Sequence, residues 1–432
     1  MNYFSLNHKA PTVNFEEATV NGIAPDKGLY FPESLIPLDK LMLETIEFMS
    51  NEQIAYEVIR QFVNKSIPKK ELRKIVEETL NFDFPLIQLD EQTYSLELFH
   101  GPTMAFKDVG ARFMARCLGY FNRNKKDQKI RVLVATSGDT GGAVAHGFLG
   151  VEGVEVIILY PSGKVSEIQE KQLTTLGQNI TALEVDGTFD DCQAMVKQAF
   201  LDEELTTLNL TSANSINVAR WLPQMFYYFF AYKELKPLHK KMVFSVPSGN
   251  FGNICAGMLA KSLGLPIEFF VAATNVNDTV PQFLKTGTYS AKPSTATISN
   301  AMDVGDPSNF VRIQQLYSND TEALKETFTS FSFSDDETKK AMKEIYTKTN
   351  YITDPHGAVG YLGWQKIKDE FPDALGIFLE TAHPVKFLET VEETLSTKIA
   401  IPQQIKEVIQ KEKKSITIKS YSALKDYLLN SY

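Results

Sequence analysis

Short runs of β-branched and apolar residues alternate with amphipathic or small-residue stretches along the middle of the chain. The apolar runs predict buried strands at residues 131–135, 155–160, 180–185, 208–210, 242–246 and 267–272. The intervening stretches predict helices at residues 140–149, 166–176, 191–200, 218–235 and 254–263. Strands that alternate with helices indicate βαβ units and a mostly parallel sheet covered on both faces. The pattern therefore predicts an α/β protein.

The N-terminal region has a different pattern and predicts a mainly helical unit. Apolar residues recur at helical spacing over residues 44–64 and 69–80, and Pro68 and Pro85 mark breaks. No internal repeat or low-complexity segment interrupts this region or the rest of the chain.

The pattern changes again in the C-terminal third. Residues 335–349 and 357–371 predict helices, and residues 374–381 predict a last core strand. Residues 289–300 and 318–335 are polar and rich in serine and threonine, so we expect surface connections there.

Composition excludes several classes of protein. With 43% hydrophobic and 22% charged residues, the chain of 432 residues is unlike a disordered protein or a coiled coil. The formal net charge of -9 lacks the basic footprint of a nucleic-acid binder. The apolar stretch at residues 225–232 is too short to span a bilayer, and the first residues lack a signal-peptide pattern. Three scattered cysteines suit a reducing compartment, so we expect a cytoplasmic protein without membrane or nucleic-acid partners.

A glycine-containing loop, SGNFGN at residues 248–253, follows one predicted strand and opens the next helix. Glycines allow close approach of an anion, and the N–H groups of a helix N-terminus point at it. The loop matches neither a Walker A sequence nor G-x-G-x-x-G. It predicts a phosphate cup; the alternative is an ordinary turn between strand and helix.

A second such loop, TSGDTGG at residues 136–142, follows the strand at residues 131–135. Its hydroxyl and N–H groups could bind an anionic group such as a carboxylate. The alternative is that Asp139 caps the following helix, with glycines allowing close packing.

Lys107 lies in a third segment, HGPTMAFKD at residues 100–108. Phe106, Val109 and Phe113 belong to one helical stripe, which places Lys107 in the first turn of that helix. A cation there opposes the helix macrodipole, so we expect a lowered pKa, which suits an amine that forms a Schiff base. The alternative is an ordinary solvated lysine.

Two further segments carry candidate polar groups. Ser215, Asn217 and Arg220 precede an aromatic helix, and Arg220 could bind a phosphate or carboxylate with two hydrogen bonds. Capping of that helix by Asn214 or Ser215 is the alternative.

After the last strand, Thr381 could hydrogen-bond a ring nitrogen, and His383 is either a general base or, as we favour, a capped loop histidine. The six histidines show no metal-ligand spacing with cysteines, and no G-x-S-x-G elbow is present. We therefore expect neither a metal site nor a catalytic triad.

These segments together resemble the threonine synthase family, pyridoxal-phosphate enzymes of the tryptophan-synthase-β group (fold type II). The resemblance covers almost the whole chain and rests on many motifs in the same order: NGIAPDKGLYFP, LELFHGPTMAFKD, ATSGDTGGAVAH, LYPSGKVSEIQEKQ, SANSIN, VPSGNFGN, AATNVNDTVPQFL, SNAMDV and ETAHPVKF. It implies mostly parallel sheets covered by helices. It also implies an N-terminal domain over residues 1–95, a smaller α/β domain over 131–204, and a larger cofactor-binding domain formed by 96–130 with 205–432.

The resemblance implies a role for each candidate residue. Lys107 matches the catalytic lysine, which holds pyridoxal 5'-phosphate as an aldimine and then moves protons. The other residues implied to bind the cofactor are Asp139 near its 3′-oxygen, Thr381 at its ring nitrogen, and Gly249, Asn250, Phe251, Gly252 and Asn253 at its phosphate. The segments implied to bind the carboxylate and phosphate of the substrate contain Thr136, Ser137, Thr140, Ser215, Asn217 and Arg220.

The implied reaction converts O-phospho-L-homoserine and water to L-threonine and phosphate, the last step of threonine biosynthesis. The alternatives are another lyase on the same fold, such as a threonine dehydratase or a phospholyase, and a non-catalytic relative that only binds the cofactor. The oligomeric state stays open between a monomer and a homodimer.

Overall fold

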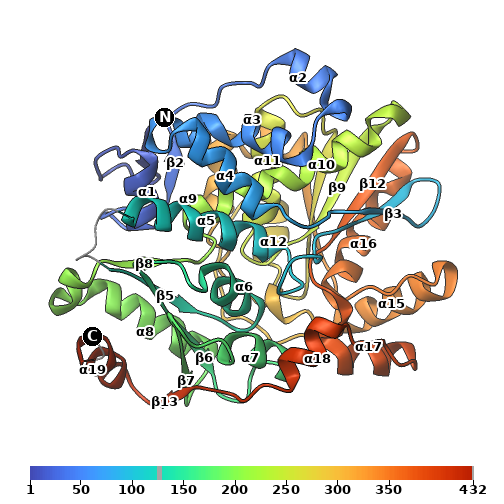
Figure 1. The fold of residues 1–432 in the computed structure, drawn as a ribbon. Helices are drawn as coiled ribbons and strands as arrows, with labels where there is room; N and C mark the ends of the chain where they lie inside the picture. Colours follow the sequence, from blue (N-terminus) through green and yellow to red (C-terminus); the bar gives the residue numbers. More distant parts are fainter. Residues whose placement is uncertain (124–128, 431–432) are drawn as a thin grey trace.

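Two mostly parallel β-sheets, each covered by helices, form the body of the molecule (Figure 1). The computed structural model describes residues 1–123 and 129–430. The smaller sheet has the order β13-β7-β6-β5-β8 and is parallel throughout. Its strands are β5 (Ile130–Ala135), β6 (Val154–Pro161), β7 (Ile180–Val185), β8 (Leu210–Ser212) and β13 (Ile416–Ile418). The helices around it are α5 (Lys107–Asn122), α6 (Asp139–Phe148), α7 (Glu167–Thr174), α8 (Phe189–Leu201) and α19 (Tyr421–Asn430).

Side chains of β5 alternate between the two faces of the smaller sheet, as expected for a strand that is buried on both sides. Val132 and Val134 belong to the main hydrophobic core, which includes α5 and α6. Leu133 and Ala135 pack with residues of α8 and α19 on the opposite face. A strand of this kind needs apolar residues at most of its positions, and β5 has only Arg131 as an exception, which is why its sequence predicts it clearly.

The larger sheet has the order β11-β10-β9-β12-β4-β3 and is parallel except for the pairing of β3 with β4. Its strands are β3 (Leu86–Gln88), β4 (Thr93–Glu97), β9 (Lys241–Pro247), β10 (Phe269–Thr274), β11 (Phe328–Ser332) and β12 (Ala374–Glu380). The helices of this region are α9 (Val218–Trp221), α10 (Phe226–Leu235), α11 (Gly252–Ser262), α12 (Thr279–Thr286), α13 (Phe310–Leu316), α14 (Thr321–Lys325), α15 (Asp335–Thr349), α16 (Pro355–Ile367), α17 (Leu388–Leu395) and α18 (Gln403–Ile409). In β9, Phe244 packs in the main core with α11, and Val243 packs with Trp364 of α16 on the other face.

The N-terminal unit is mainly helical, as predicted. It contains an antiparallel pair of short strands and four helices: β1 (Tyr3–Ser5), β2 (Tyr30–Pro32), α1 (Phe15–Asn21), α2 (Lys40–Glu44), α3 (Asn51–Val63) and α4 (Lys69–Thr79). One hydrophobic cluster contains Tyr3 of this unit, Val132 of the smaller sheet and Phe244 of the larger sheet. Because the core is continuous, the three-domain boundaries drawn from the sequence stay a prediction.

Two sequence predictions are wrong in detail. Residues 318–335 are not only a surface connection, because they contain α14 and the edge strand β11. The helix predicted over residues 218–235 is divided into α9, a 3₁₀ turn at Leu222–Met225 and α10. Pro223 lies in that turn and has no N–H group for a continuous α-helix.

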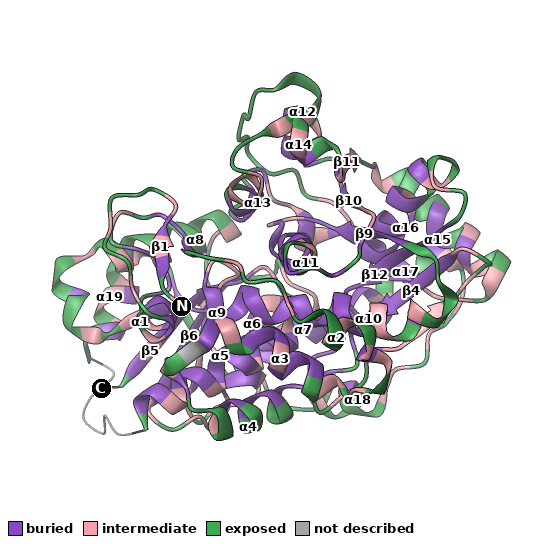
Figure 2. Cartoon of the chain, turned by 90° about the horizontal axis from the view of Figure 1, so that it is seen from above, coloured by how far each residue is buried: buried purple, intermediate pink, exposed green. Residues whose placement is uncertain are grey.

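Buried residues are concentrated in the strands and in the helices next to them, and exposed residues lie on outer helices and loops (Figure 2). None of the helices in the described ranges has the length and apolar character needed to cross a membrane. The carboxyl ends of β4, β5, β8, β9 and β12 all lead into segments that carry candidate site residues. Ligands of such sheets bind at the carboxyl ends of strands, so these segments are where the site is built.

Candidate active site

Lys107 is the first residue of α5 and lies at the junction of two distant segments. The N–H of Phe106 donates to the carbonyl of Thr381 at 2.9 Å, and Ala105 pairs with Ala382 in an isolated bridge. This contact holds the start of α5 against the end of β12. It places Lys107 and Thr381 on the same cavity, as the resemblance implies.

The amine of Lys107 has no hydrogen-bond or ion-pair partner among the described residues. Burial lowers the pKa of Lys107 to about 8, with Arg220 and Lys386 acting in the same direction and Asp139 opposing them. The pKa of Lys107 is therefore lowered, as the sequence predicts. The main cause is removal of the amine from water rather than the helix macrodipole. At this pKa a substantial fraction of the amine is neutral near physiological pH and can act as a base or nucleophile.

The glycine loop between β9 and α11 lines the same cavity. A Cβ on Gly249 would lie 2.8 Å from the Cα of Met302 and 2.9 Å from the carbonyl oxygen of Ala301, so only glycine fits there. Phe251 adopts a left-handed conformation, with φ of 60°, just before α11 begins. Within the described residues, the N–H groups from Gly249 to Asn253 have no acceptor, as a phosphate cup requires.

Arg220 also lines this cavity and its side chain is buried. One guanidinium nitrogen, Nη1, donates to the carbonyl of Ala213 at 2.5 Å, whereas Nε is buried without a partner. In the described part of the chain, no carboxylate forms an ion pair with it. Burial lowers the pKa of Arg220 to about 10, and a buried cation without a partner is costly. Arg220 is therefore well placed to receive an anionic ligand.

The loop after β5 lines an adjoining cavity that shares Lys107 and Thr140 with the first one. Thr136 is buried and holds the loop together, because its Oγ1 accepts from the N–H groups of Gly138 and Gly141 at 3.0 and 2.8 Å. Ser137 and Thr140 are partly exposed to the cavity, and their hydroxyl groups have no partner among the described residues.

Asp139 is held by a buried ion pair. Its Oδ1 lies 2.7 Å from Nζ of Lys386 and accepts from Nε2 of Gln169 at 3.0 Å. Burial would raise the pKa of Asp139, but the ammonium groups of Lys386 and Lys107 outweigh this and hold the pKa well below its usual range. The alternative in which Asp139 caps α6 is wrong, because Gly138 occupies the N-cap and Asp139 is the first helical residue.

Asn217 lies outside both cavities and has a structural role in this fold. Its Oδ1 accepts from the N–H of Ala219 at 3.0 Å, so it is the N-cap of α9. Its Nδ2 donates to the carbonyls of Thr19 and Ser212. The alternative that Asn214 or Ser215 caps this helix is therefore wrong, and Ser215 instead lines the cavity with Arg220.

His383 is a loop histidine, as favoured from the sequence. Its Nδ1 accepts from the N–H of Val385 at 3.0 Å and so caps the following 3₁₀ turn. Burial lowers the pKa of His383 to about 4. It is neutral at physiological pH.

Sequence reasoning missed Lys386 and His356. Lys386 lies within the ETAHPVKF motif, but its pairing with Asp139 joins segments far apart along the chain. His356 follows Asp354 and Pro355 at the start of α16 and lines the cavity with Lys107. The described residues contain no group of three or more His, Cys, Asp or Glu side chains placed to hold a metal ion.

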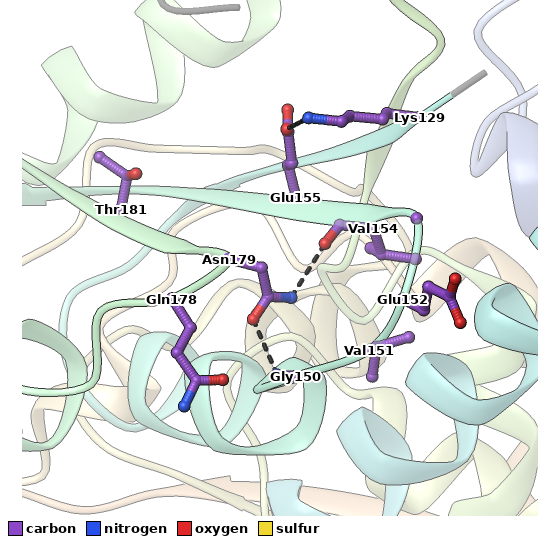
Figure 3. Close-up of a pocket in the computed structure, with 10 residues that line it drawn as sticks. Lys129, Gly150, Val151, Glu152, Val154, Glu155, Gln178, Asn179 and Thr181 are labelled. Atoms are coloured by element: carbon purple, nitrogen blue, oxygen red, sulfur yellow. Dashed lines mark hydrogen bonds and ion pairs between the residues drawn. The ribbon is translucent and has the colours of Figure 1, made fainter. Parts of the chain in front are cut away.

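A separate cavity of about 500 Å³ lies at the other end of the smaller sheet (Figure 3). Residues before β6 and β7 line it, and Asn179 bridges Gly150 and Val154 there. It contains none of the predicted site residues. Because it lies at the amino ends of the strands, it is not where ligands of α/β sheets normally bind.

The fold and the cavity lined by Lys107 define the class of pyridoxal-phosphate-dependent enzymes, and the family profile of that description matches residues 84–378. Two further profiles, described as the threonine synthase N terminus and the threonine synthase C-terminal region, match residues 2–80 and 357–428. The chain belongs to the threonine synthase family.

Individual threonine synthases are similar to this chain over its full length, in sequence and in structure. A threonine synthase from Buchnera aphidicola subsp. Acyrthosiphon pisum is 44% identical, with 99% of this chain and 100% of the relative covered. The crystal structure of threonine synthase from Escherichia coli superposes with a TM-score of 0.92 and 41% identity, covering 100% of both chains. A structure of pyridoxal-phosphate-bound threonine synthase from Brucella melitensis has a TM-score of 0.92 and 33% identity, covering 99% of this chain and 98% of that one. These comparisons confirm the predicted α/β, fold type II architecture.

Proposed function

We propose that this protein converts O-phospho-L-homoserine and water to L-threonine and phosphate, with pyridoxal phosphate held at Lys107. The observation that carries the proposal is the pairing, in one cavity, of a partly buried amine with a lowered pKa and a buried guanidinium that forms no ion pair with a carboxylate among the described residues. The first group suits proton transfer, and the second suits a phosphorylated substrate.

The residues of the cavity fit the cofactor. Lys107 offers a free amine for its aldehyde carbon, and Thr381 offers a hydroxyl group for its ring nitrogen. The unpaired N–H groups from Gly249 to Asn253 offer donors for its phosphate, in a loop where a Cβ at Gly249 would not fit. Asp139 would face the 3′-oxygen. When bound, pyridoxal phosphate supplies an electron sink that stabilises negative charge at carbon.

Lys107 is the proposed base. Its amine accepts the proton from Cα of the substrate and returns a proton at a neighbouring carbon. Removal from water supports this role, because it favours the neutral form of the amine. The same lysine can both take and give a proton because its pKa of about 8 is close to physiological pH.

Arg220 and Ser215 are proposed to bind the phosphate group of the substrate and to stabilise it as it leaves. A guanidinium binds phosphate with two parallel hydrogen bonds, and it does so more strongly where water is excluded. The unpaired hydroxyl groups of Ser137 and Thr140 are proposed to bind the carboxylate of the substrate. We do not extend this role to Asn217, because its amide is fully occupied by the cap of α9.

The experiment that tests the proposal follows two products together. The purified protein and pyridoxal phosphate are incubated with O-phospho-L-homoserine, and threonine and phosphate are measured over time. Equal amounts of both support the synthase reaction. Phosphate with 2-oxobutyrate and no threonine would identify a phospholyase, and neither product from a protein that retains the cofactor would refute the substrate.

A reducing compartment is proposed as the site of this reaction. Cys117, Cys192 and Cys255 are all buried and free. Burial raises the pKa of the thiol of Cys192 and of Cys255 to about 12, so neither is activated for disulfide exchange.

A further inference from the structure

A buried pair of side chains, Asp354 and His356, lies at the start of α16 beside the cavity. Asp354 is the N-cap of this helix and accepts from the N–H of Gly357 at 2.7 Å. Its other oxygen, Oδ2, lies 2.6 Å from Nδ1 of His356. On the far side of the ring, Nε2 of His356 lies 3.2 Å from the backbone nitrogen of Ala301 and accepts its N–H.

These contacts determine which ring nitrogen carries the proton. A backbone N–H can only donate, so Nε2 of His356 must be unprotonated to accept it. The proton of the neutral ring is then on Nδ1, where it is donated to the carboxylate of Asp354. The opposite tautomer would place two N–H groups face to face between His356 and Ala301.

Ala301, whose N–H donates to His356, packs against the predicted phosphate cup at residues 249–253. Ala301 belongs to a single 3₁₀ turn, Asn300–Met302, which is too short to keep its position by its own hydrogen bonds. This turn lies directly against Gly249, where a Cβ would meet the backbone of both Ala301 and Met302. Displacement of the turn would therefore open or distort the loop from Gly249 to Asn253.

Asp354 also contacts the segment that carries Thr381, the residue proposed to bind the ring nitrogen of the cofactor. Its own N–H donates to Oε1 of Glu380 at 2.6 Å, and Glu380 immediately precedes Thr381. Gly357 packs against this carboxyl group so closely that a Cβ would lie 1.5 Å from Oε2 of Glu380. Burial and the neighbouring Asp354 raise the pKa of Glu380 well above its usual value.

We propose that Asp354 and His356 are positioning residues for the cofactor. Asp354 keeps His356 in the Nδ1-protonated form, so that Nε2 accepts the N–H of Ala301 and holds the turn against the phosphate cup. Through Glu380 the same pair connects that cup to Thr381. The inference rests on the proposed cofactor site, but it concerns how the site is held together rather than which reaction it performs.

The first test is the tautomer itself. In protein labelled with ¹⁵N-histidine, the ¹⁵N chemical shifts of His356 report which ring nitrogen is protonated, and the spectrum of His356→Gln assigns the signals. We expect an unprotonated Nε2 in the wild-type protein. A protonated Nε2 in the wild-type protein would overturn the proposal without any variant having to fold.

The second test separates the two hydrogen bonds of the ring with a matched pair of variants. In His356→Gln, the side-chain oxygen can reach the place of Nε2 and still accept from Ala301. In His356→Asn, the shorter side chain replaces only Nδ1 and leaves the N–H of Ala301 without an acceptor. The dissociation constant of pyridoxal phosphate from the apoprotein is measured by equilibrium dialysis, and the melting temperature of each apoprotein is recorded beside it.

We expect His356→Asn to weaken cofactor binding roughly tenfold more than His356→Gln, the effect of one unsatisfied, partly buried donor. In Asp354→Asn the cap of α16 is retained, because asparagine is a good N-cap. The amide nitrogen then faces Nδ1, so the proton moves to Nε2, and cofactor binding falls as in His356→Asn. Equal affinities in all three variants would overturn the proposal. Failure of the wild-type protein to bind the cofactor would instead overturn the proposed function.

Discussion

The ammonium group of Lys386 lies 2.7 Å from Oδ1 of Asp139, and both side chains are buried. The pair joins the segment after β12 to the first residue of α6, so it spans the two sheets. In the proposed cofactor site, Asp139 would face the 3′-oxygen of pyridoxal phosphate and would repel it unless the charge of the carboxylate were balanced. Lys386 supplies that balance, and it also adds positive charge near Lys107.

The rate at which the apoprotein takes up pyridoxal phosphate should depend on the protonation of Lys107. Only the neutral amine attacks the aldehyde, so the rate should rise with pH and level off above the pKa. We expect a midpoint near 8 instead of the ordinary lysine value of 10.5. Stopped-flow absorbance from about pH 6 to about pH 11, a range that brackets both values, measures it. A midpoint above 10 would contradict the burial of this amine.

Replacement of Lys386 by methionine should move that midpoint upward. Lys386 lowers the pKa of Lys107, and its loss also leaves Asp139 free to stabilise the charged amine, so both changes favour protonation. Lys398→Met is the matched control, because Lys398 is exposed and pairs only with Glu392 among the described residues. An unchanged or lowered midpoint in Lys386→Met, with folding verified by circular dichroism, would show that the two amines are not coupled.

Replacement of Lys107 by alanine should abolish product formation. The loss of the proposed base alone reduces turnover by about 10²- to 10⁴-fold, and the covalent attachment of the cofactor is lost as well. Phosphate release from O-phospho-L-homoserine measures activity, and the mass of the denatured protein after borohydride reduction reports covalent attachment. Retained activity, or a retained mass increase, would exclude Lys107 from this role.

Replacement of Arg220 by methionine should weaken binding of the phosphorylated substrate. Hydrogen bonds to charged groups contribute enough that KM should rise roughly 10- to 100-fold. Inhibition by inorganic phosphate should weaken in parallel, whereas the affinity for pyridoxal phosphate should change little. An unchanged KM and phosphate inhibition would remove Arg220 from the substrate site.

Replacement of Gly249 by alanine should weaken cofactor binding more than other glycine substitutions nearby. The new Cβ would meet backbone atoms of Ala301 and Met302, which cannot move aside as a flexible side chain can. Gly142→Ala is the control, because a Cβ there would be 3.4 Å from Gln172, an ordinary contact. Equilibrium dialysis of both apoproteins measures the difference. Similar affinities would show that the turn at Asn300–Met302 yields easily.

Most strands buried on both faces could be predicted from the sequence because they need apolar residues at most positions. β5, β6 and β7 are mostly apolar in this way. The strand β4, with the sequence TYSLE, was not predicted although every residue is buried. Its polar side chains are satisfied by neighbours such as Trp364 and Tyr351, which are remote in the chain.

In the candidate site too, some features follow from a short stretch of sequence and others depend on partners remote in the chain. Lys107 and the glycine loop could be identified from the sequence, because each depends on a short segment in which neighbouring residues share one element. The cap formed by Asn217, the pair of Asp139 with Lys386, and the contact of His356 with Ala301 could not. Each joins a side chain to a partner that only the packing of two sheets and their loops brings near. Local backbone preference determines the elements, and burial of distant polar groups against one another determines which of them form the site.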